Sequence, residues 1–374
     1  MLPVPSPSLA DLPEGELLIA CAQHALGTPD SSPANPLSDR LLAPMERPLR
    51  WDLVLRSAQQ QGLIPALHRS LDRQPAVPQA VRDRLRLLFR VNAARNKQLL
   101  NALGEVLALF AAHEIPALPY KGPVLAVTLY GDLSRRACGD LDVLVRPGDL
   151  LRGRDLLLAQ GYAPQHRFRD RNEEQQHLRA ECEYNLERSS DGVLVELHWA
   201  FHPRSFPLPL DMDDLWDRTR TVRVGGLTTL TMASEDLLLV LCVHGAKHCW
   251  ERLGWICDVA ALLRAHPDLD GRTLASEAKA LGCERVLWLG LTLARDLLGA
   301  DPPAPFGTRP PAVMAALAAQ VRRQIVGPKD RPLLRGLFHL RVRDRLSDRL
   351  PYMRRQAHWW FRGWFREPQE KWKS

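Results

Sequence analysis

The sequence predicts an α+β protein in which a small mixed sheet lies between two helical regions. Apolar residues recur at helical spacing in residues 47–114 and again in residues 211–326. Residues 115–210 instead contain short segments of alternating apolar and polar residues, which are typical of strands. A Pro/Ser-rich segment, residues 1–46, precedes these parts, and a basic aromatic tail, residues 327–374, follows them. We therefore expect a sheet-containing core between an N-terminal helical region and a C-terminal helical domain.

Composition excludes several classes of protein. The chain has 374 residues, of which 45% are hydrophobic and 25% are charged, as in globular proteins rather than disordered chains or disulfide-rich miniproteins. It contains no apolar run of about 18 residues, so we expect no transmembrane segment. No secretory signal is recognisable, and the seven cysteines form no Cys-x-x-Cys pair. We expect a cytoplasmic protein with reduced thiols.

The net charge of +7 is concentrated in the tail. Arg322–Ser374 holds 15 basic and 5 acidic residues, so the rest of the chain is slightly acidic. Within the tail, His358–Arg366 mixes aromatic residues with arginines. Such a segment suits a helix packed on the core, contact with an anionic surface, or contact with RNA through stacking and charge.

The remaining elements follow from periodicity and from turn residues. Helices are expected at residues 14–25, 78–113 (one or two helices), 124–130, 147–160, 235–250 (capped by Ser234), 255–265, 273–281, 283–298 and 312–325. Strands are expected at residues 115–120, 140–145, 162–168, 181–188 and 193–199, with the last two joined as a hairpin. Loops are expected at residues 28–35, 131–139 and 301–311.

A pair of aspartates marks the candidate site. In the strand at residues 140–145, Asp140 and Asp142 point to one side, because side chains alternate along a strand. Two carboxylates about 7 Å apart on one face repel each other unless a cation lies between them, and Mg²⁺ binds such groups together with substrate phosphates. The alternative is that both acids lie on a solvated strand face.

A third acid fits the same site. Glu196 lies in the middle of the apolar strand at residues 193–199 and shares a face with His198. A buried glutamate is costly without a partner. If this strand lies beside the first, Glu196 joins the two aspartates. His198 then either faces the acceptor or has a structural role.

Several basic residues are candidates for binding phosphates. Lys121 and Gly122 form a turn before a helix, where a glycine allows a phosphate to approach the backbone. Arg135 and Arg136, in the following loop, are expected to reach the same phosphates.

A later helix contributes further candidates. His244 and His248 are four residues apart, and Lys247 lies between them. They are expected either to bind a metal, to face the substrate, or to be packed or solvated residues of the helix. For Asp258 we expect a helix cap or an ion pair with Arg252.

The order of these motifs resembles the uncharacterised nucleotidyltransferase family of the polymerase-β-like superfamily. The resemblance covers about residues 85–300 and rests on these motifs: Lys121-Gly122, Leu129-Tyr130-Gly131-Asp132, Arg135 or Arg136, Gly139–Val145, Gly161-Tyr162 and Val195–Trp199. It implies a nucleotidyltransferase fold with three metal-binding acids, Asp140, Asp142 and Glu196. It also implies Mg²⁺ or Mn²⁺ and a nucleoside triphosphate such as ATP. Much of the superfamily has Gly-Ser where this chain has Lys121-Gly122-Pro123.

Three functions are consistent with these features. The first is transfer of a nucleoside monophosphate to a hydroxyl of an unidentified small molecule, peptide or protein. The second is a catalytically degenerate protein that binds a nucleotide or a partner. The third is an RNA-directed nucleotidyltransferase. The complete set of acids favours the first over the second, and the lack of excess basic charge outside the tail disfavours the third.

Overall fold

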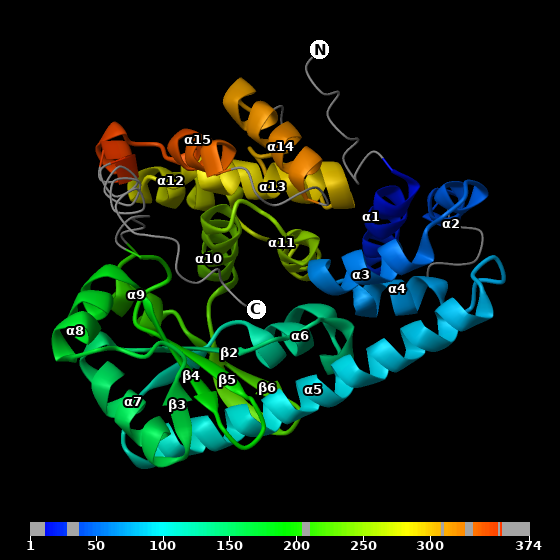
Figure 1. Cartoon of the computed structure of the whole chain (residues 1–374). Coiled ribbons are helices and arrows are strands. Elements are labelled where there is room, and N and C mark those ends of the chain that lie inside the picture. Colours follow the sequence, from blue (N-terminus) through cyan, green and yellow to red (C-terminus); the bar gives the residue numbers. More distant parts are fainter. Residues whose placement is uncertain are drawn as a thin grey trace, which may run out of the picture.

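A five-stranded mixed sheet carries the candidate acids Asp142 and Glu196 (Figure 1). Its strand order is β1-β2-β5-β4-β3, where only the β2–β5 pair is parallel. The strands are β1 (Ala117–Pro119), β2 (Leu141–Val145), β3 (Tyr162–Pro164), β4 (Glu183–Arg188) and β5 (Leu194–His198). The mixed sheet with its surrounding helices confirms the predicted α+β class.

The computed structural model describes most of the chain. The described residues are 12–27, 37–203, 210–307, 310–325, 332–350 and 352–353. The predicted loop at residues 28–35 lies outside them, as does the aromatic segment His358–Arg366 of the tail. In the described part of the chain, no helix combines the length and apolar character needed to cross a membrane.

The long helix α5 connects the N-terminal helices to the sheet. Helices α1 (Pro13–Leu26), α2 (Leu37–Leu42), α3 (Trp51–Gln61) and α4 (Ile64–Leu71) precede α5 (Gln79–Ala112), with a short 3₁₀ turn η2 (Ala43–Glu46). One end of α5 packs on the N-terminal helices through Leu85, and the other packs under the sheet through Leu103 and Phe110. In Figure 1, α5 runs below both groups of elements. The segment predicted as one or two helices is therefore a single helix.

Shorter helices surround the sheet. They are α6 (Gly122–Tyr130), α7 (Leu150–Ala159), α8 (Arg171–Ala180) and α9 (Met212–Asp217), with 3₁₀ turns η3 (Leu133–Arg135) and η4 (Pro147–Asp149). The helix predicted at residues 147–160 thus begins as a 3₁₀ turn, and the strand predicted at 162–168 ends at Pro164.

A β-hairpin occupies a region for which only helices were predicted. Strands β6 (Arg220–Val224) and β7 (Leu227–Thr231) pair antiparallel around Gly225-Gly226, both of which have positive φ. Thr, Val and Arg alternate before this turn, and Gly-Gly is a typical hairpin connection. The expectation that residues 211–326 form only helices was therefore wrong for residues 220–231, where the Gly-Gly turn is the local signal of the hairpin.

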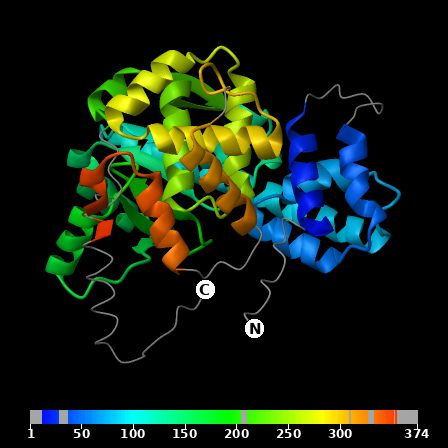
Figure 2. The same cartoon turned by 90° about the horizontal axis from the view of Figure 1, so that it is seen from above.

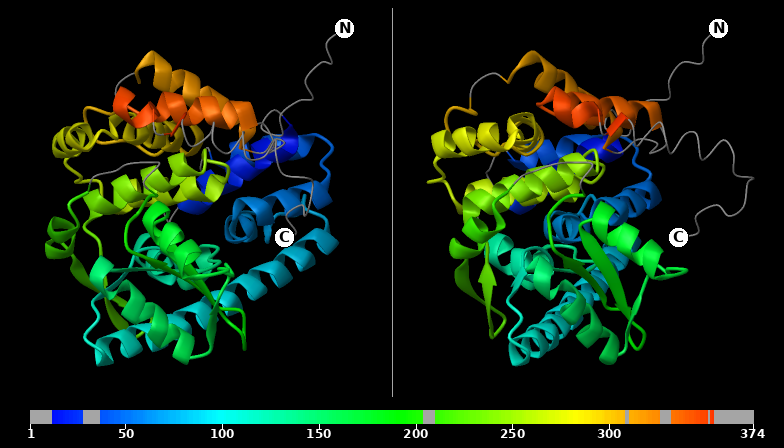
Figure 3. Two further views of the ribbon diagram at one scale, coloured as in Figure 1. Left: turned by 60° about the vertical axis from the view of Figure 1, so that its left-hand side comes forward. Right: turned by 90° about the vertical axis from the view of Figure 1, so that its left-hand side faces the viewer.

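The C-terminal helices lie above the sheet in Figures 1 and 3, and in Figure 2, which is seen from above, they lie in front of it. They are α10 (Ser234–Lys247), α11 (Leu253–Ala265), α12 (Gly271–Leu281), α13 (Glu284–Leu298), α14 (Ala312–Gln324) and α15 (Pro332–Val342). Ser234 is the first helical residue of α10 and Ala233 is its N-cap, which corrects the predicted capping role of Ser234.

The side chain of Trp250 packs between helices α10 and α13. Its side chain is fully buried, and it packs against the backbone of Gly245 in α10 and of Gly290 in α13. A Cβ atom at Gly245 would lie 2.5 Å from atoms of the indole ring. The close approach therefore requires glycine, and it fixes the position of the helix that carries His244, Lys247 and His248.

We predict that Gly245→Ala lowers the free energy of unfolding by about 1–3 kcal/mol, as overpacking a core does. The matched control is Gly336→Ala in α15, where no atom lies within 4 Å of the added Cβ. That change should be neutral or stabilising by up to about 1 kcal/mol, because alanine favours helix. Urea unfolding of both variants measures the difference. Equal stabilities would show that Trp250 does not constrain α10.

Candidate active site

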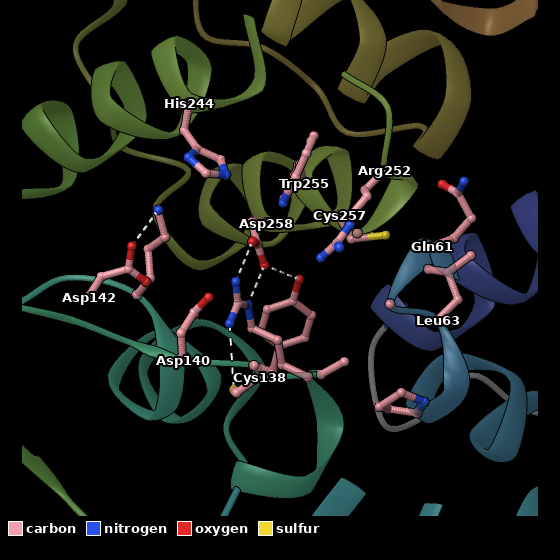
Figure 4. A pocket seen from close by; sticks show the side chains of 18 of the residues that line it. Gln61, Leu63, Cys138, Asp140, Asp142, His244, Arg252, Trp255, Cys257 and Asp258 are labelled. Carbon is pink, nitrogen blue, oxygen red and sulfur yellow. Dashed lines mark hydrogen bonds and ion pairs between the residues drawn. The ribbon is translucent and has the colours of Figure 1, made fainter. Parts of the chain in front are cut away.

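A cavity of about 550 Å³ lies between the sheet, the N-terminal helices and helices α10 and α11 (Figure 4). Figure 4 shows Asp140 and Asp142 on one side of this cavity and Gln61 and Leu63 on the other. Ten of the eleven residues expected at the site line it: Lys121, Arg135, Arg136, Asp140, Asp142, Glu196, His198, His244, Lys247 and His248. The eleventh, Gly122, is not among the lining residues.

Parallel pairing of β2 and β5 brings two acids and a histidine together. In this register Asp142 lies opposite Glu196, and Leu144 lies opposite His198. Residues 142 and 144, and residues 196 and 198, each share a strand face, so both pairs lie on the same side of the sheet. One possible ligand atom from each of Asp142, Glu196 and His198 lies within 4.8 Å of the other two. Carboxylate oxygens in this arrangement suit a divalent cation.

Lys121 forms an ion pair with Asp142 inside the site. The Nζ atom lies 2.7 Å from Oδ1, and the two side chains are only 10% and 2% exposed. Burial opposes ionisation of both groups, but the pKa of Asp142 lies well below its usual range because Lys121 and His198 stabilise the carboxylate. Burial likewise opposes the charge on Lys121, yet Asp142, Glu196 and Asp140 raise its pKa. Lys121 therefore points into the site and not to solvent.

Gly122 allows α6 to begin directly beside the acids. Its φ is +55°, and a Cβ atom would lie 3.0 Å from the carbonyl oxygen of Asp140. Only glycine adopts this conformation readily. The residue thus sets the backbone geometry next to Lys121, while its own atoms lie outside the cavity lining.

Asp140 stands one residue before β2 and is half-buried. It is not part of the group formed by Asp142, Glu196 and His198 within 4.8 Å. Burial, and then the neighbouring carboxylates of Asp142 and Glu196, raise its pKa to about 7. Asp140 therefore lies close enough to the other acids for charge repulsion.

His198 is buried between carboxylates. Its Nε2 atom lies 3.4 Å from Asp142 Oδ1 and 3.5 Å from Glu196 Oε2, and its Nδ1 atom lies 3.8 Å from Glu183 Oε2. Neither ring nitrogen has a hydrogen-bond partner of good geometry in the described part of the chain. Burial opposes protonation of the ring, but the surrounding groups raise its pKa well above the usual range.

Arg136 is held by Asp258 of α11. Its Nε and Nη2 atoms donate to the two carboxylate oxygens at 2.8 and 2.9 Å, and the Tyr130 hydroxyl donates to Oδ1 at 2.7 Å. The expected cap or Arg252 pair for Asp258 was therefore wrong; the guanidinium of Arg252 lies over the ring of Trp255 instead. The network connects the loop after α6 to the C-terminal helices.

Arg135, by contrast, is exposed. It makes one long hydrogen bond, 3.4 Å, to the carbonyl oxygen of Tyr130. Of the two neighbouring arginines, Arg135 is thus the one whose guanidinium is not engaged by a carboxylate in the described structure, and it lines the cavity.

The two histidines of α10 pack around Trp255. The rings of His244 and His248 lie 4.8 Å apart, and each lies 5.0–5.2 Å from the Trp255 ring. Burial and nearby lysines lower the pKa of His248 to about 3 and the pKa of His244 well below its usual range. Both imidazoles are therefore neutral, and among the described residues they belong to no group of three donors that could hold a metal.

Cys182 and Glu183 were not among the residues predicted for the site. Glu183 lies opposite His198 in the β4–β5 hairpin and accepts a hydrogen bond from Lys247 at 3.3 Å. The hairpin itself was predicted, so counting its register outward from the turn would have placed Glu183 beside His198. Gln61 and Leu63 gave no such signal, because tertiary packing alone brings them to the cavity.

Replacing Asp140 with Asn is predicted to stabilise the metal-free protein, and more so at about pH 8 than at about pH 5. A carboxyl whose pKa rises from 3.8 to about 7 on folding makes its full contribution to stability only below about pH 3.8, and above that pH the unfolded chain gains by ionising first. That contribution is lost as the pH rises towards 7. Thermal unfolding in the presence of a chelator measures the difference. The exposed Asp268→Asn control should show no such trend, and a pH-independent effect of Asp140→Asn would contradict the repulsion.

Comparisons with known proteins agree with this geometry. The family model for uncharacterised nucleotidyltransferases matches residues 47–299, which include the sheet, every acid of the site and helices α10 to α13. Searches of curated proteins and of solved structures found no match. The match covers well over half of the sequence, and the chain therefore belongs to the uncharacterised nucleotidyltransferase family.

Proposed function

We propose that the protein transfers a nucleoside monophosphate from a nucleoside triphosphate to a hydroxyl group of an acceptor. The observation that carries this proposal is the juxtaposition of Asp142 and Glu196 on adjacent parallel strands inside a cavity. Family membership supports the same chemistry. The acceptor is a small molecule, a peptide or a protein.

The donor atoms fit a hard divalent cation. Asp142, Glu196 and the neighbouring Asp140 supply carboxylate oxygens, the ligands that Mg²⁺ and Mn²⁺ prefer. The ammonium of Lys121 pairs with the carboxylate of Asp142, so positive charge is stabilised beside this carboxylate. A bound Mg²⁺ or Mn²⁺ would stabilise the negative charge that develops on the phosphates during transfer.

The protein's own side chains have separate tasks in this proposal. Arg135 and Lys247 line the cavity and would contact the phosphates of the nucleotide together with Lys121. The carboxylate of Glu196 is 20% exposed, against 2% for Asp142, so it is the more accessible of the two. In this proposal Glu196 would accept the proton of the acceptor hydroxyl. The acceptor itself would enter from the side of Gln61 and Leu63.

One observation favours a second function, nucleotide binding without catalysis. The ammonium of Lys121 donates a hydrogen bond to Oδ1 of Asp142, an oxygen that a metal ion would otherwise bind. In addition, the chain has Lys121-Gly122-Pro123 where much of the superfamily has Gly-Ser. If this ion pair persists when nucleotide binds, Asp142 cannot serve fully as a ligand. The protein would then bind a nucleotide or a partner and transfer nothing.

The experiment uses each nucleoside triphosphate labelled at the α-phosphate, with Mg²⁺ or Mn²⁺ and fractionated cell extract as the source of acceptor. We expect transfer of the α-label with release of pyrophosphate. Asp142→Asn and Glu196→Gln should each lower the rate by at least about 100-fold, since even residues that only support metal ligands contribute 10–100-fold. Their folds should remain intact by circular dichroism.

Glu187→Gln is the matched control, because Glu187 lies exposed on β4 of the same sheet and outside the cavity lining. It should retain full activity. Binding of nucleotide without transfer under any condition would favour the second function. Transfer that survives in both Asp142→Asn and Glu196→Gln would contradict the proposal.

A further inference from the structure

Three potential metal ligands of different chemistry meet at the start of β4. One donor atom each from Cys182, Glu183 and His198 lies within 4.8 Å of the other two. Cys182 and His198 are buried, with 1% and 3% exposure. This group adjoins the cluster of Asp142 and Glu196 and shares His198 with it.

Two of the three donor–donor distances are close to those of a tetrahedral zinc site, and all three donors lie within 4.8 Å of one another. Sγ of Cys182 lies 3.8 Å from Oε2 of Glu183, and Nδ1 of His198 lies 3.8 Å from the same oxygen. Donors at the usual zinc bond lengths around a tetrahedral centre lie roughly 3.4–3.6 Å apart. Small side-chain movements therefore suffice to bring all three atoms onto one ion.

The two nitrogens of His198 face different groups. Nε2 lies near the carboxylates of Asp142 and Glu196, whereas Nδ1 lies near Glu183. Histidines that bind a metal usually donate their other N–H to a carboxylate, which fixes the ring and its tautomer. A buried imidazole with no hydrogen-bond partner of good geometry at either nitrogen is costly, and a metal on Nδ1 would give one nitrogen its partner.

We propose that Cys182, Glu183 and His198 form a second metal site, selective for Zn²⁺ or a similar transition-metal ion. The thiolate and the imidazole select against Mg²⁺, which prefers oxygen donors. Binding requires both groups to lose their protons. Glu183 and His198 line the cavity, so the fourth coordination position opens towards it. The site shares His198 with the Asp142–Glu196 cluster but takes its other two donors from Cys182 and Glu183. It does not depend on the proposed transferase function.

The ammonium of Lys247 lies beside Cys182 and Glu183, so a positive charge is already stabilised at the proposed metal site. Its Nζ atom lies 3.3 Å from Glu183 Oε2 and 4.0 Å from Cys182 Sγ. In the described structure this ammonium balances the carboxylate, and a divalent ion would take over that role.

Cobalt(II) added to the reduced, chelator-treated full-length protein tests the site without any assay of activity. We expect a near-ultraviolet thiolate-to-cobalt charge-transfer band whose intensity saturates at one thiolate-bound Co²⁺ per chain. Cys182→Ser should abolish the band. Cys138→Ser, at a cysteine that lines the cavity, should keep it, and so should Asp140→Asn, which alters only the carboxylate cluster.

Co²⁺ binding without the band, or a band that survives Cys182→Ser, would overturn the proposal. If Cys182→Ser does not fold, zinc X-ray absorption of the wild-type protein decides the question. We then expect one sulfur ligand at about 2.3 Å. A coordination shell of nitrogen and oxygen alone would overturn the proposal.

Discussion

The buried ion pair between Lys121 and Asp142 is the interaction on which the rest of the site depends. Removing both charges from water is costly, and only a short contact with further favourable partners can compensate for that cost. The contact is 2.7 Å long, and it joins the N-cap residue of α6 to the second residue of β2. Gly122 lets the backbone approach closely enough for the contact to form. A carboxylate thus remains ionised at the centre of the sheet.

The surrounding cavity depends on contributions from distant parts of the chain. Asp258 of α11 binds Arg136 and Tyr130, and this buried network connects α6 and the loop after it to the C-terminal helices. On the opposite side, Gln61 donates to the carbonyl oxygen of Glu251 and accepts from the backbone N–H of Leu253. Residues separated by about half of the sequence therefore define one cavity. We infer that the N-terminal helices shape the space available to an acceptor.

The sequence allowed the sheet and most helices to be predicted, because alternating or helical periodicity is a local property. The strands of Asp142 and Glu196 carry that periodicity clearly. The β6–β7 hairpin was not predicted because only Val224 of β6 and Thr229 of β7 are buried, so its strands have no clear apolar face. The partner of Asp258 could not be predicted, since Arg136 lies 122 residues away and comes close only through packing of α11. Likewise, no local pattern shows that Lys121 contacts Asp142, or that Asp140 stands apart from Glu196 and His198.

A double-mutant cycle on Lys121 and Asp142 tests most directly whether this ion pair organises the site. Urea unfolding would be measured for Lys121→Met, Asp142→Asn and the double variant, all without metal. Each single change should cost about 3–5 kcal/mol, because it leaves one buried charge unpaired. The double variant should be more stable than Lys121→Met, because no unpaired carboxylate remains. Losses that simply add in the double variant would contradict the account, since they would show that the two groups do not depend on each other.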